Sequence, residues 1–342
     1  MGMTKARDAL IAVLCGLAVL LPGSAGLAGE HDYPRFFTIG TGSSAGTYFP
    51  IGSLIASAIS RPGGSSPCGQ GGACGVDNLI ATAITTLGSF ENLEGIATRK
   101  LDSGLAQADV VAWAFEGAEI FTGQGVFPDL RAIANLYPEH VHLVARKDLG
   151  IESISDLKGR KVAIDRDGSG TRINALLILA AFGVEHDDIE AVSAGPELSI
   201  TSLLEERIDA AFFVVGYPSA AVSELLDTGR FELVAIDGAA AGQLLFTNRY
   251  YTASSIPAGA YGGNPVTPTL SVGAQWITHA DISDDLIYNI TAALWNEENR
   301  GLLDTGHLKG EQIRLETALE GLTIPLHPGA RRYYVEMGLI GE

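Results

Sequence analysis

Two short segments rich in glycine, serine and threonine have the composition of anion-binding loops. They are IGTGSSAGTYFP at Ile39 to Pro50 and AIDRDGSGTR at Ala163 to Arg172, and each lies between a predicted strand and a predicted helix. Small residues there leave backbone N–H groups and hydroxyls directed at a ligand, and a helix N-terminus favours negative charge. Because one segment falls in each candidate lobe, the pattern predicts an anion held between two lobes.

The first segment also contains Gly42-Ser43-Ser44-Ala45-Gly46, which matches the G-x-S-x-G nucleophile elbow of serine hydrolases. In that interpretation Ser44 is the nucleophile. The later histidines that could complete a triad are His279, His307 and His327, but no spacing singles one out. The motif is short and surrounded by serine and glycine, so a chance match is the stronger interpretation.

Charged residues of the second segment have two interpretations each. Arg172 can pair bidentately with a ligand carboxylate or form a surface salt bridge on a first helical turn. Asp165 and Asp167 can hold a ligand ammonium group or complement the dipole of the helix that follows. The sequence does not separate these alternatives.

Aromatic and histidine residues supply further candidates. Tyr48, Phe115 and Tyr217 are candidate pocket walls, although an aromatic side chain more often belongs to a core. His140 and His142 share one face of a predicted strand and could bind a metal, but no further ligands accompany them. Packed histidines are the favoured interpretation, so no metal and no cofactor is predicted.

Composition indicates a globular α/β protein rather than a nucleic-acid binder. The chain has 342 residues, of which 46% are hydrophobic and 18% charged, and 42 are glycine. This length suggests about two domains. The formal net charge of −18 disfavours nucleic acid and anionic membranes as partners, because both repel acidic surfaces.

The N-terminus has the pattern of a cleavable secretory signal over residues 1–28. Lys5 and Arg7 precede an apolar run from Ala9 to Leu21, which includes Cys15 and is followed by small residues. A membrane anchor is the alternative, but the run is shorter than the roughly 20 residues that span a bilayer. We therefore expect a secreted protein that has no stable membrane insertion.

Two cysteines remain beyond the signal, Cys68 and Cys74, in the stretch SSPCGQGGACG. In an oxidising compartment such a pair is expected to form a disulfide that closes a small loop. A zinc site is the alternative, but it normally requires four ligands, and no second Cys or His pair accompanies these two.

Apolar runs alternate with helical patterns along the rest of the chain, as a sheet covered by helices requires. Tyr137-Pro138 is predicted to form a turn between two strands that cross between lobes. Lobe 1 is predicted to comprise 31–138 plus 265–342, and lobe 2 to comprise 139–264. The predicted strands are Phe36–Ile39, Ile80–Thr85, Val110–Ala114, Ala132–Leu136, Val141–Ala145, Lys161–Ile164, Ala191–Ser193, Ala210–Val215, Leu233–Ile236 and Leu270–Ile277, and the clearest early helices are Phe49–Ile59 and Leu93–Leu101.

Over nearly all of its length beyond the signal, the chain resembles the TAXI family of solute receptors. The resemblance is carried, in order, by FTIGTGSSAGTYFPIG, TTLGSFENLEGIATRKLDSGLAQADVVAWAFEG, RAIANLYPEHVHLVARKD, ISDLKGRKVAIDRDGSGTR, ERIDAAFFVVGYPSAAVSEL and IPLHPGARRYYVEMG. It implies a two-lobed periplasmic-binding-protein fold of type II, with a mixed sheet and flanking helices in each lobe.

The resemblance also implies a function without catalysis. A monomeric receptor closes by hinge motion on a small carboxylate, such as a glutamate-like amino acid, a dicarboxylate or a 2-oxoacid. It then delivers this ligand to the membrane permease of a tripartite ATP-independent periplasmic (TRAP) transporter. The ligand-binding residues predicted from the resemblance and the two loops are Ser43, Thr47, Tyr48, Asn92, Gln107, Gly168, Ser169, Gly170, Thr171, Arg172 and Tyr217.

Overall fold

The computed structural model describes residues 33–70, 72–123 and 125–341, and these contain one large mixed sheet. The predicted secretory signal, with Cys15, lies outside the described residues. The ten-stranded sheet has the order β4-β1-β5-β12-β6-β9-β7-β8, with β10 on β6 and β11 on β12. Its strands are β1 (Arg35–Gly40), β4 (Leu79–Ile84), β5 (Ser103–Gln107), β6 (Leu130–Arg146), β7 (Lys161–Ala163), β8 (Glu190–Val192), β9 (Ala210–Val215), β10 (Phe231–Val234), β11 (Tyr251–Ile256) and β12 (Thr267–His279). Outside it, β2 (Ser60–Arg61) pairs with β3 (Val76–Asp77).

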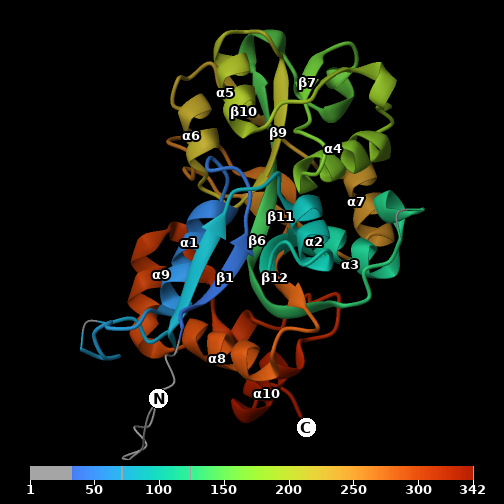
Figure 1. Ribbon diagram of the computed structural model, residues 1–342. Coiled ribbons are helices and arrows are strands. Elements are labelled where there is room, and N and C mark those ends of the chain that lie inside the picture. Colours follow the sequence, from blue (N-terminus) through green and yellow to red (C-terminus); the bar gives the residue numbers. More distant parts are fainter. Residues whose placement is uncertain (1–32, 71, 124, 342) are drawn as a thin grey trace, which may run out of the picture. The chain divides into compact units, whose positions relative to one another are not determined.

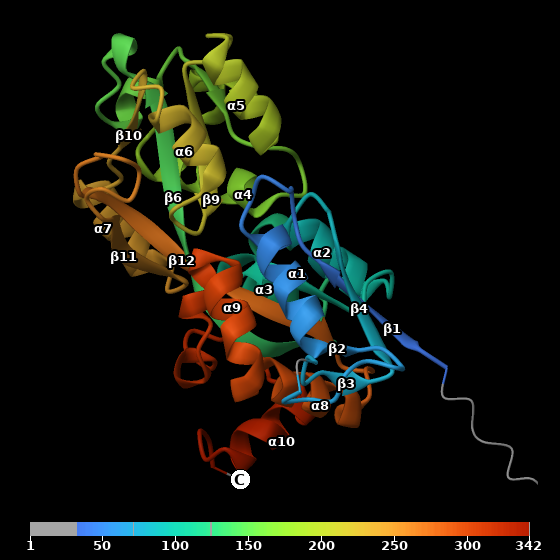
Figure 2. The same ribbon diagram turned by 90° about the vertical axis from the view of Figure 1, so that its left-hand side faces the viewer.

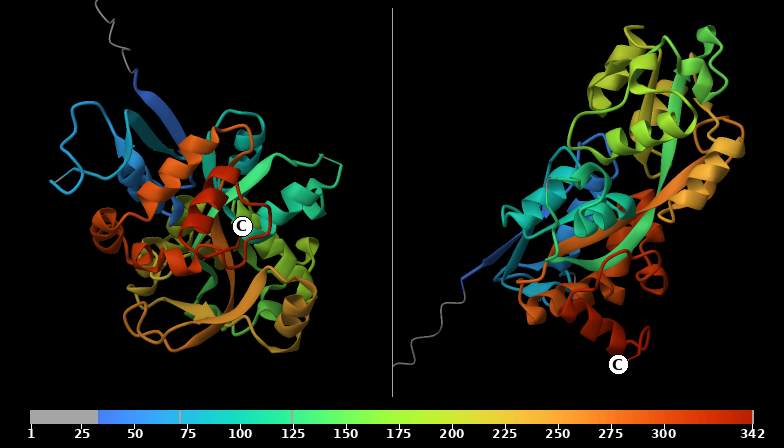
Figure 3. Two further views of the ribbon diagram at one scale, coloured as in Figure 1. Left: turned by 90° about the horizontal axis from the view of Figure 1, so that it is seen from below. Right: turned by 90° about the vertical axis from the view of Figure 1, so that its right-hand side faces the viewer.

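Helices flank this sheet (Figure 1), so the predicted α/β class is confirmed. They are α1 (Tyr48–Ile59), α2 (Ser89–Ala97), α3 (Ala108–Glu116), α4 (Gly170–Ala181), α5 (Pro196–Leu204), α6 (Ala220–Leu226), α7 (Gly238–Thr247), α8 (Asp284–Leu294), α9 (Arg300–Gly306) and α10 (Pro328–Glu336). Near the C-terminal end, α10 packs on α8 (Figure 3).

Apolar side chains gather into two groups, which we term the first and second regions. In the first, β1, α1, α2, α3 and α8 enclose Phe37 and Trp276, and in the second, α4 to α7 cover β7 and β9 around Phe213. Strand β6 belongs to both, because Ile133–Tyr137 pack in the first group and Val141–Ala145 in the second. Figure 2 shows β6 as a long arrow between the two groups of helices.

Most predicted strands are confirmed, but the turn at Tyr137-Pro138 is wrong. Strand β6 continues without interruption through these residues, and Pro138 pairs in register with Gly273 of β12. Proline removes only one donor from the ladder. The rest of β6 stays paired with β12 on one side and with β9 beyond, so the strand tolerates this loss. The lobe boundaries predicted from this turn remain a proposal.

The predicted strand Val110–Ala114 is also wrong, since these residues lie inside helix α3. A short apolar run has the same appearance in a buried helix and in a buried strand, and residues 108–114 are all buried. The strand is instead β5, immediately before the helix, whose sequence SGLAQ has no strong strand pattern. The predicted helix at Leu93–Leu101 begins earlier, as α2, and ends at Ala97. The sequence analysis did not predict β11.

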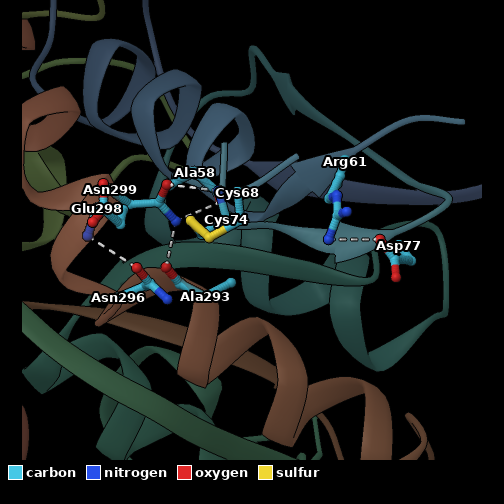
Figure 4. The surroundings of a disulfide bond; sticks show 9 residues. All are labelled: Ala58, Arg61, Cys68, Cys74, Asp77, Ala293, Asn296, Glu298 and Asn299. Atoms are coloured by element: carbon cyan, nitrogen blue, oxygen red, sulfur yellow. Dashed lines mark hydrogen bonds and ion pairs between the residues drawn. A yellow bond between two sulfur atoms is a disulfide. The ribbon is translucent and has the colours of Figure 1, made fainter. Parts of the chain in front are cut away.

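Cys68 and Cys74 form a disulfide that closes the loop between β2 and β3 (Figure 4). Their sulfurs are therefore not available as zinc ligands. The side chain of Asn299 ties this loop to the first region: its Oδ1 accepts from the Cys74 N–H at 3.0 Å, and its Nδ2 donates to the carbonyls of Ala58 and Ala293. In the described ranges no helix has the length and apolar character needed to cross a membrane.

Candidate functional site

The N-terminal ends of several helices meet around one cavity. Its volume is about 60 Å³, and it opens toward a larger surface groove with which it shares Ser43, Leu87 and Arg166. The lining comes from the starts of α1, α2, α4 and α5, from the residue before α3, and from β6 and β9: Gly42, Ser43, Gly46, Thr47, Tyr48, Leu87, Gly88, Ser89, Gln107, Glu139, Asp165, Arg166, Ser169, Gly170, Thr171, Pro196, Val214 and Val215.

These helix ends differ in their charge. The first turns of α2, α3 and α5 carry Glu91, Asp109 and Glu197, whereas the first turns of α1 and α4 carry no acidic residue. A helix N-terminus has a partial positive charge, which an acidic side chain in the first turn compensates. The ends of α1 and α4 are therefore the two uncompensated ones, and they follow the two loops identified from the sequence.

The loop before α1 is held by its own polar groups and by the second region. The Ser43 hydroxyl accepts from the Ala45 N–H at 3.1 Å and donates to Glu197. The Thr47 hydroxyl accepts from the N–H of Gly216, at the end of β9, at 3.1 Å. Both Ser43 and Thr47 thus make contacts between the two regions as well as lining the cavity.

The loop before α4 is built as a helix cap. The Ser169 hydroxyl accepts from the Arg172 N–H at 3.1 Å, and the Thr171 hydroxyl accepts from the Val214 N–H at 3.3 Å. A Cβ atom at Gly170 would lie 2.0 Å from Gln107 Oε1, so a side chain there would displace the carboxamide of Gln107. The start of α4 therefore lies directly against the first region.

Gln107 and Glu139 form the deeper wall of the cavity. Both are 2% exposed. The Tyr48 hydroxyl donates to Glu139 Oε2 at 2.7 Å, and Ser89 Oγ accepts from the Gln107 N–H at 3.1 Å. Burial raises the pKa of Glu139 to about 8, because a desolvated carboxylate is disfavoured. The Gln107 Oε1 atom is buried and has no hydrogen-bond partner within the part of the chain that the structure describes.

Arg166 is the only cation that lines the cavity, among the residues that the structure describes. Its Nε atom is buried 3.8 Å from Asp165 Oδ1 and has no hydrogen-bond partner in residues 33–70, 72–123 and 125–341. Burial raises the pKa of Asp165. The sequence analysis did not select Arg166, which lies between two aspartates that it did consider.

Several predicted ligand residues lie elsewhere. Asn92 is fully buried and donates to the carbonyls of Thr41 and Leu105, at 2.6 and 2.7 Å. These bonds join the backbone of the loop before α1 to strand β5. Arg172 pairs with Asp167 at 2.8 Å. Together with Gly168, both line a second cavity of about 410 Å³, which shares Ser169 with the first and whose walls include Phe90 and Trp113.

Tyr217 and the two strand histidines lie in a buried polar cluster behind the cavity. The Tyr217 ring packs on His140 at 4.5 Å, and the Lys309 ammonium lies 4.1 Å from the same ring. His140 contacts the Ser254 hydroxyl, and His142 contacts the hydroxyl of Tyr261. Burial lowers the pKa of His140 to about 3 and that of His142 to about 4, so both are neutral packing groups. Phe115 packs against the first region.

Lys309, which is 1% exposed, was not predicted from the sequence. Burial lowers the pKa of its ammonium group to about 8. No group of three or more His, Cys, Asp or Glu able to hold a metal occurs within residues 33–70, 72–123 and 125–341.

The Ser44 hydroxyl contacts Glu197 at 3.4 Å, and no histidine is among the described residues that line its groove. The three downstream histidines are used locally. His279, His307 and His327 each accept, through Nδ1, a hydrogen bond from the backbone N–H two residues later. The structure therefore does not assemble a triad around the G-x-S-x-G match.

Comparison with solved structures establishes the fold. PhnD1 from Prochlorococcus marinus (MIT 9301), in complex with methylphosphonate, is 14% identical and superposes over 90% of this chain and 100% of its own, with a TM-score of 0.53. MatC from Rhodopseudomonas palustris, with bound malate, is 14% identical over 90% of this chain and 98% of its own, also with a TM-score of 0.53. The periplasmic aliphatic sulphonate binding protein SsuA from Escherichia coli is 13% identical over 88% and 82%, with a TM-score of 0.43.

The similarity to PhnD1 and MatC shows the α/β fold of the periplasmic binding proteins. The family follows from the sequence itself. The model of the NMT1-like family matches residues 39–338, and the chain belongs to that family.

Proposed function

We propose that this protein is a periplasmic solute receptor that binds a small carboxylate in the cavity between the starts of α1 and α4. The observation that carries this proposal is the convergence of two uncompensated helix N-termini on one cavity. Backbone N–H groups at such ends are anion-binding donors, and the dipole adds to their effect. Arg166 supplies the one formal positive charge in the lining that the structure describes.

Family membership and fold agree with a receptor rather than an enzyme. PhnD1 and MatC were solved with small anions, methylphosphonate and malate. Because both of these proteins bind a small anion, the fold that this chain shares with them supports an anion receptor. The cavity adds serine and threonine hydroxyls, which suit carboxylate oxygens.

We further propose the TAXI type of receptor, with lobes at 31–138 plus 265–342 and at 139–264. Contacts that join the two regions at the cavity support a hinge that closes over the ligand: Ser43 meets Glu197, and Thr47 meets Gly216. In this account residues 1–28 are removed on secretion, and the monomeric receptor docks on the permease of a TRAP transporter. Delivery to a membrane sensor is the alternative destination.

Thermal unfolding tests the receptor function. The purified protein is unfolded and refolded to remove any bound ligand, and is then heated with amino acids, dicarboxylates, 2-oxoacids and uncharged amides. A ligand at ~100 times its Kd adds about 2.7 kcal/mol to the folded state. We expect a rise in Tm with one class of carboxylate and none with its amide. An amide that stabilises as well as its acid would contradict an anion site.

A further inference from the structure

The inner end of the cavity offers hydrogen-bond acceptors, whereas the helix ends offer donors. Gln107 Oε1 is buried and unpartnered, and it lies against the backbone of Gly170. A buried carbonyl oxygen without a donor destabilises the folded state, and native structures rarely leave one unpaired. A donor on the ligand would satisfy this oxygen.

Glu139 is the second acceptor at this end in its ionised form, which a donor on the ligand would favour over the buried neutral acid. Among the described residues, only the Tyr48 hydroxyl forms a hydrogen bond with the Glu139 side chain. That bond uses the hydroxyl proton of Tyr48, so Tyr48 has none left to donate to a ligand. We term Gln107 and Glu139 the acceptor pair.

Charge balance points in the same direction. Asp165 and Glu139 line the cavity, Glu197 lies at its mouth, and Arg166 is the only cation among the described lining residues. Glu139, whose pKa is raised to about 8, adds to the negative charge only when it is ionised. A ligand that brought only negative charge and acceptor oxygens would face these groups without a matching donor. A ligand that combines a carboxylate with a donor group would match both ends.

We propose that the site selects a carboxylate that also carries an N–H or O–H donor, as 2-amino and 2-hydroxy acids do, and that the acceptor pair binds this donor. The inference rests on the proposed function, because it assumes that the carboxylate lies at the starts of α1 and α4. A 2-oxo acid of the same carbon skeleton presents another acceptor to Gln107 and Glu139. It is therefore the matched compound that the site rejects.

Calorimetric titration of matched compounds tests this selection. The first set is alanine, lactate and pyruvate, and the second is glutamate, 2-hydroxyglutarate and 2-oxoglutarate. In the set that fits the cavity, we expect the 2-oxo acid to bind at least tenfold more weakly than the better of its two partners. Whether the amino or the hydroxy acid binds better identifies the donor as an ammonium or a hydroxyl group. A 2-oxo acid that binds as tightly as both partners overturns the inference.

Variants assign the selection to Gln107. Gln107→Met removes the acceptor and should reduce the preference over the 2-oxo acid to less than threefold. Gln275→Met is the matched control, because Gln275 is equally buried on the neighbouring strand but donates to the Gly321 carbonyl, away from the cavity. This control should keep the wild-type preference. A preference that survives Gln107→Met unchanged overturns the assignment.

Gln107→Glu gives an independent result if the methionine variant does not fold. It keeps the acceptor and adds a negative charge, so the ratio of amino-acid to 2-oxo-acid affinity should rise at least threefold. A ratio that stays constant or falls overturns the inference. Failure of the inference is separable from failure of the proposed function. Binding of carboxylates without discrimination refutes only the former, whereas absence of binding by any carboxylate refutes both.

Discussion

Replacing Ser169 tests the role of the α4 N-terminus without removing the helix cap. Ser169 is the N-cap of α4, and its hydroxyl accepts from the Arg172 N–H. Alanine would lose this bond and cost about 1 kcal/mol of stability. Asparagine and aspartate are both strong N-cap residues of nearly equal size. The pair Ser169→Asp and Ser169→Asn therefore differs in charge while retaining the cap.

The expected effect follows from the position of Ser169 in the cavity lining. The carboxylate that Ser169→Asp introduces would lie about 5 Å from a ligand carboxylate bound at the start of α4. At an effective dielectric constant of about 20, the repulsion between two charges at about 5 Å is about 3 kcal/mol. This corresponds to roughly 150-fold weaker binding for Ser169→Asp than for Ser169→Asn.

Isothermal titration of both variants with the best carboxylate measures this ratio. Ser283→Asp is a matched control, because Ser283 caps α8 in the same way and does not line the cavity. It should leave affinity within about twofold of wild type. If Ser169→Asp and Ser169→Asn bind the carboxylate equally, the ligand is not held at the start of α4 and the reasoning is refuted.

Two further predictions concern stability. Replacing Cys68 and Cys74 by serine should lower the free energy of unfolding by about 2 kcal/mol, as expected for a closed loop of about seven residues. Ligand affinity should not change in this variant, and urea unfolding with a parallel titration checks both expectations. Because the folded-state pKa of His142 is about 4, below the ordinary value of 6.5, its contribution to stability is present above pH 6.5 and lost as pH falls toward 4. His142→Asn should therefore reduce the loss of stability between pH 7 and pH 5 by about 2 kcal/mol. Replacing the exposed His186 is the control and should not reduce this loss. Equal pH dependence of the stability of both variants would show that His142 is not buried as a neutral group.

The sequence predicted well what local patterns determine. Strand β9 was predicted with its observed bounds, Ala210–Val215, because a continuous apolar run there contains aromatic and β-branched residues. The two loops were found because a dense run of glycine, serine and threonine between a strand and a helix is typical of an anion-binding loop. Both loops line one cavity, whereas the anion that the sequence places between them stays a prediction.

The remaining features depend on tertiary packing. Only Leu105 among the five residues of strand β5 is a large apolar residue, and the burial of β5 between β1 and β12 is what makes it a central strand. Glu139 has no distinctive sequence signal, and it reaches the cavity because β6 passes beneath α1. Asn92 was predicted as a ligand residue, yet its amide is used by two backbone carbonyls. Such roles become visible only when the partners of each side chain are known.

A crystal structure of the protein with its tightest carboxylate is the most direct test of the central claim. The account predicts that a carboxylate oxygen lies about 3 Å from a backbone nitrogen at the start of α4, Gly170 or Thr171, within the cavity that the loop before α1 also lines. A ligand bound instead in the cavity beside Phe90 and Trp113, with no contact to these N–H groups, would contradict it.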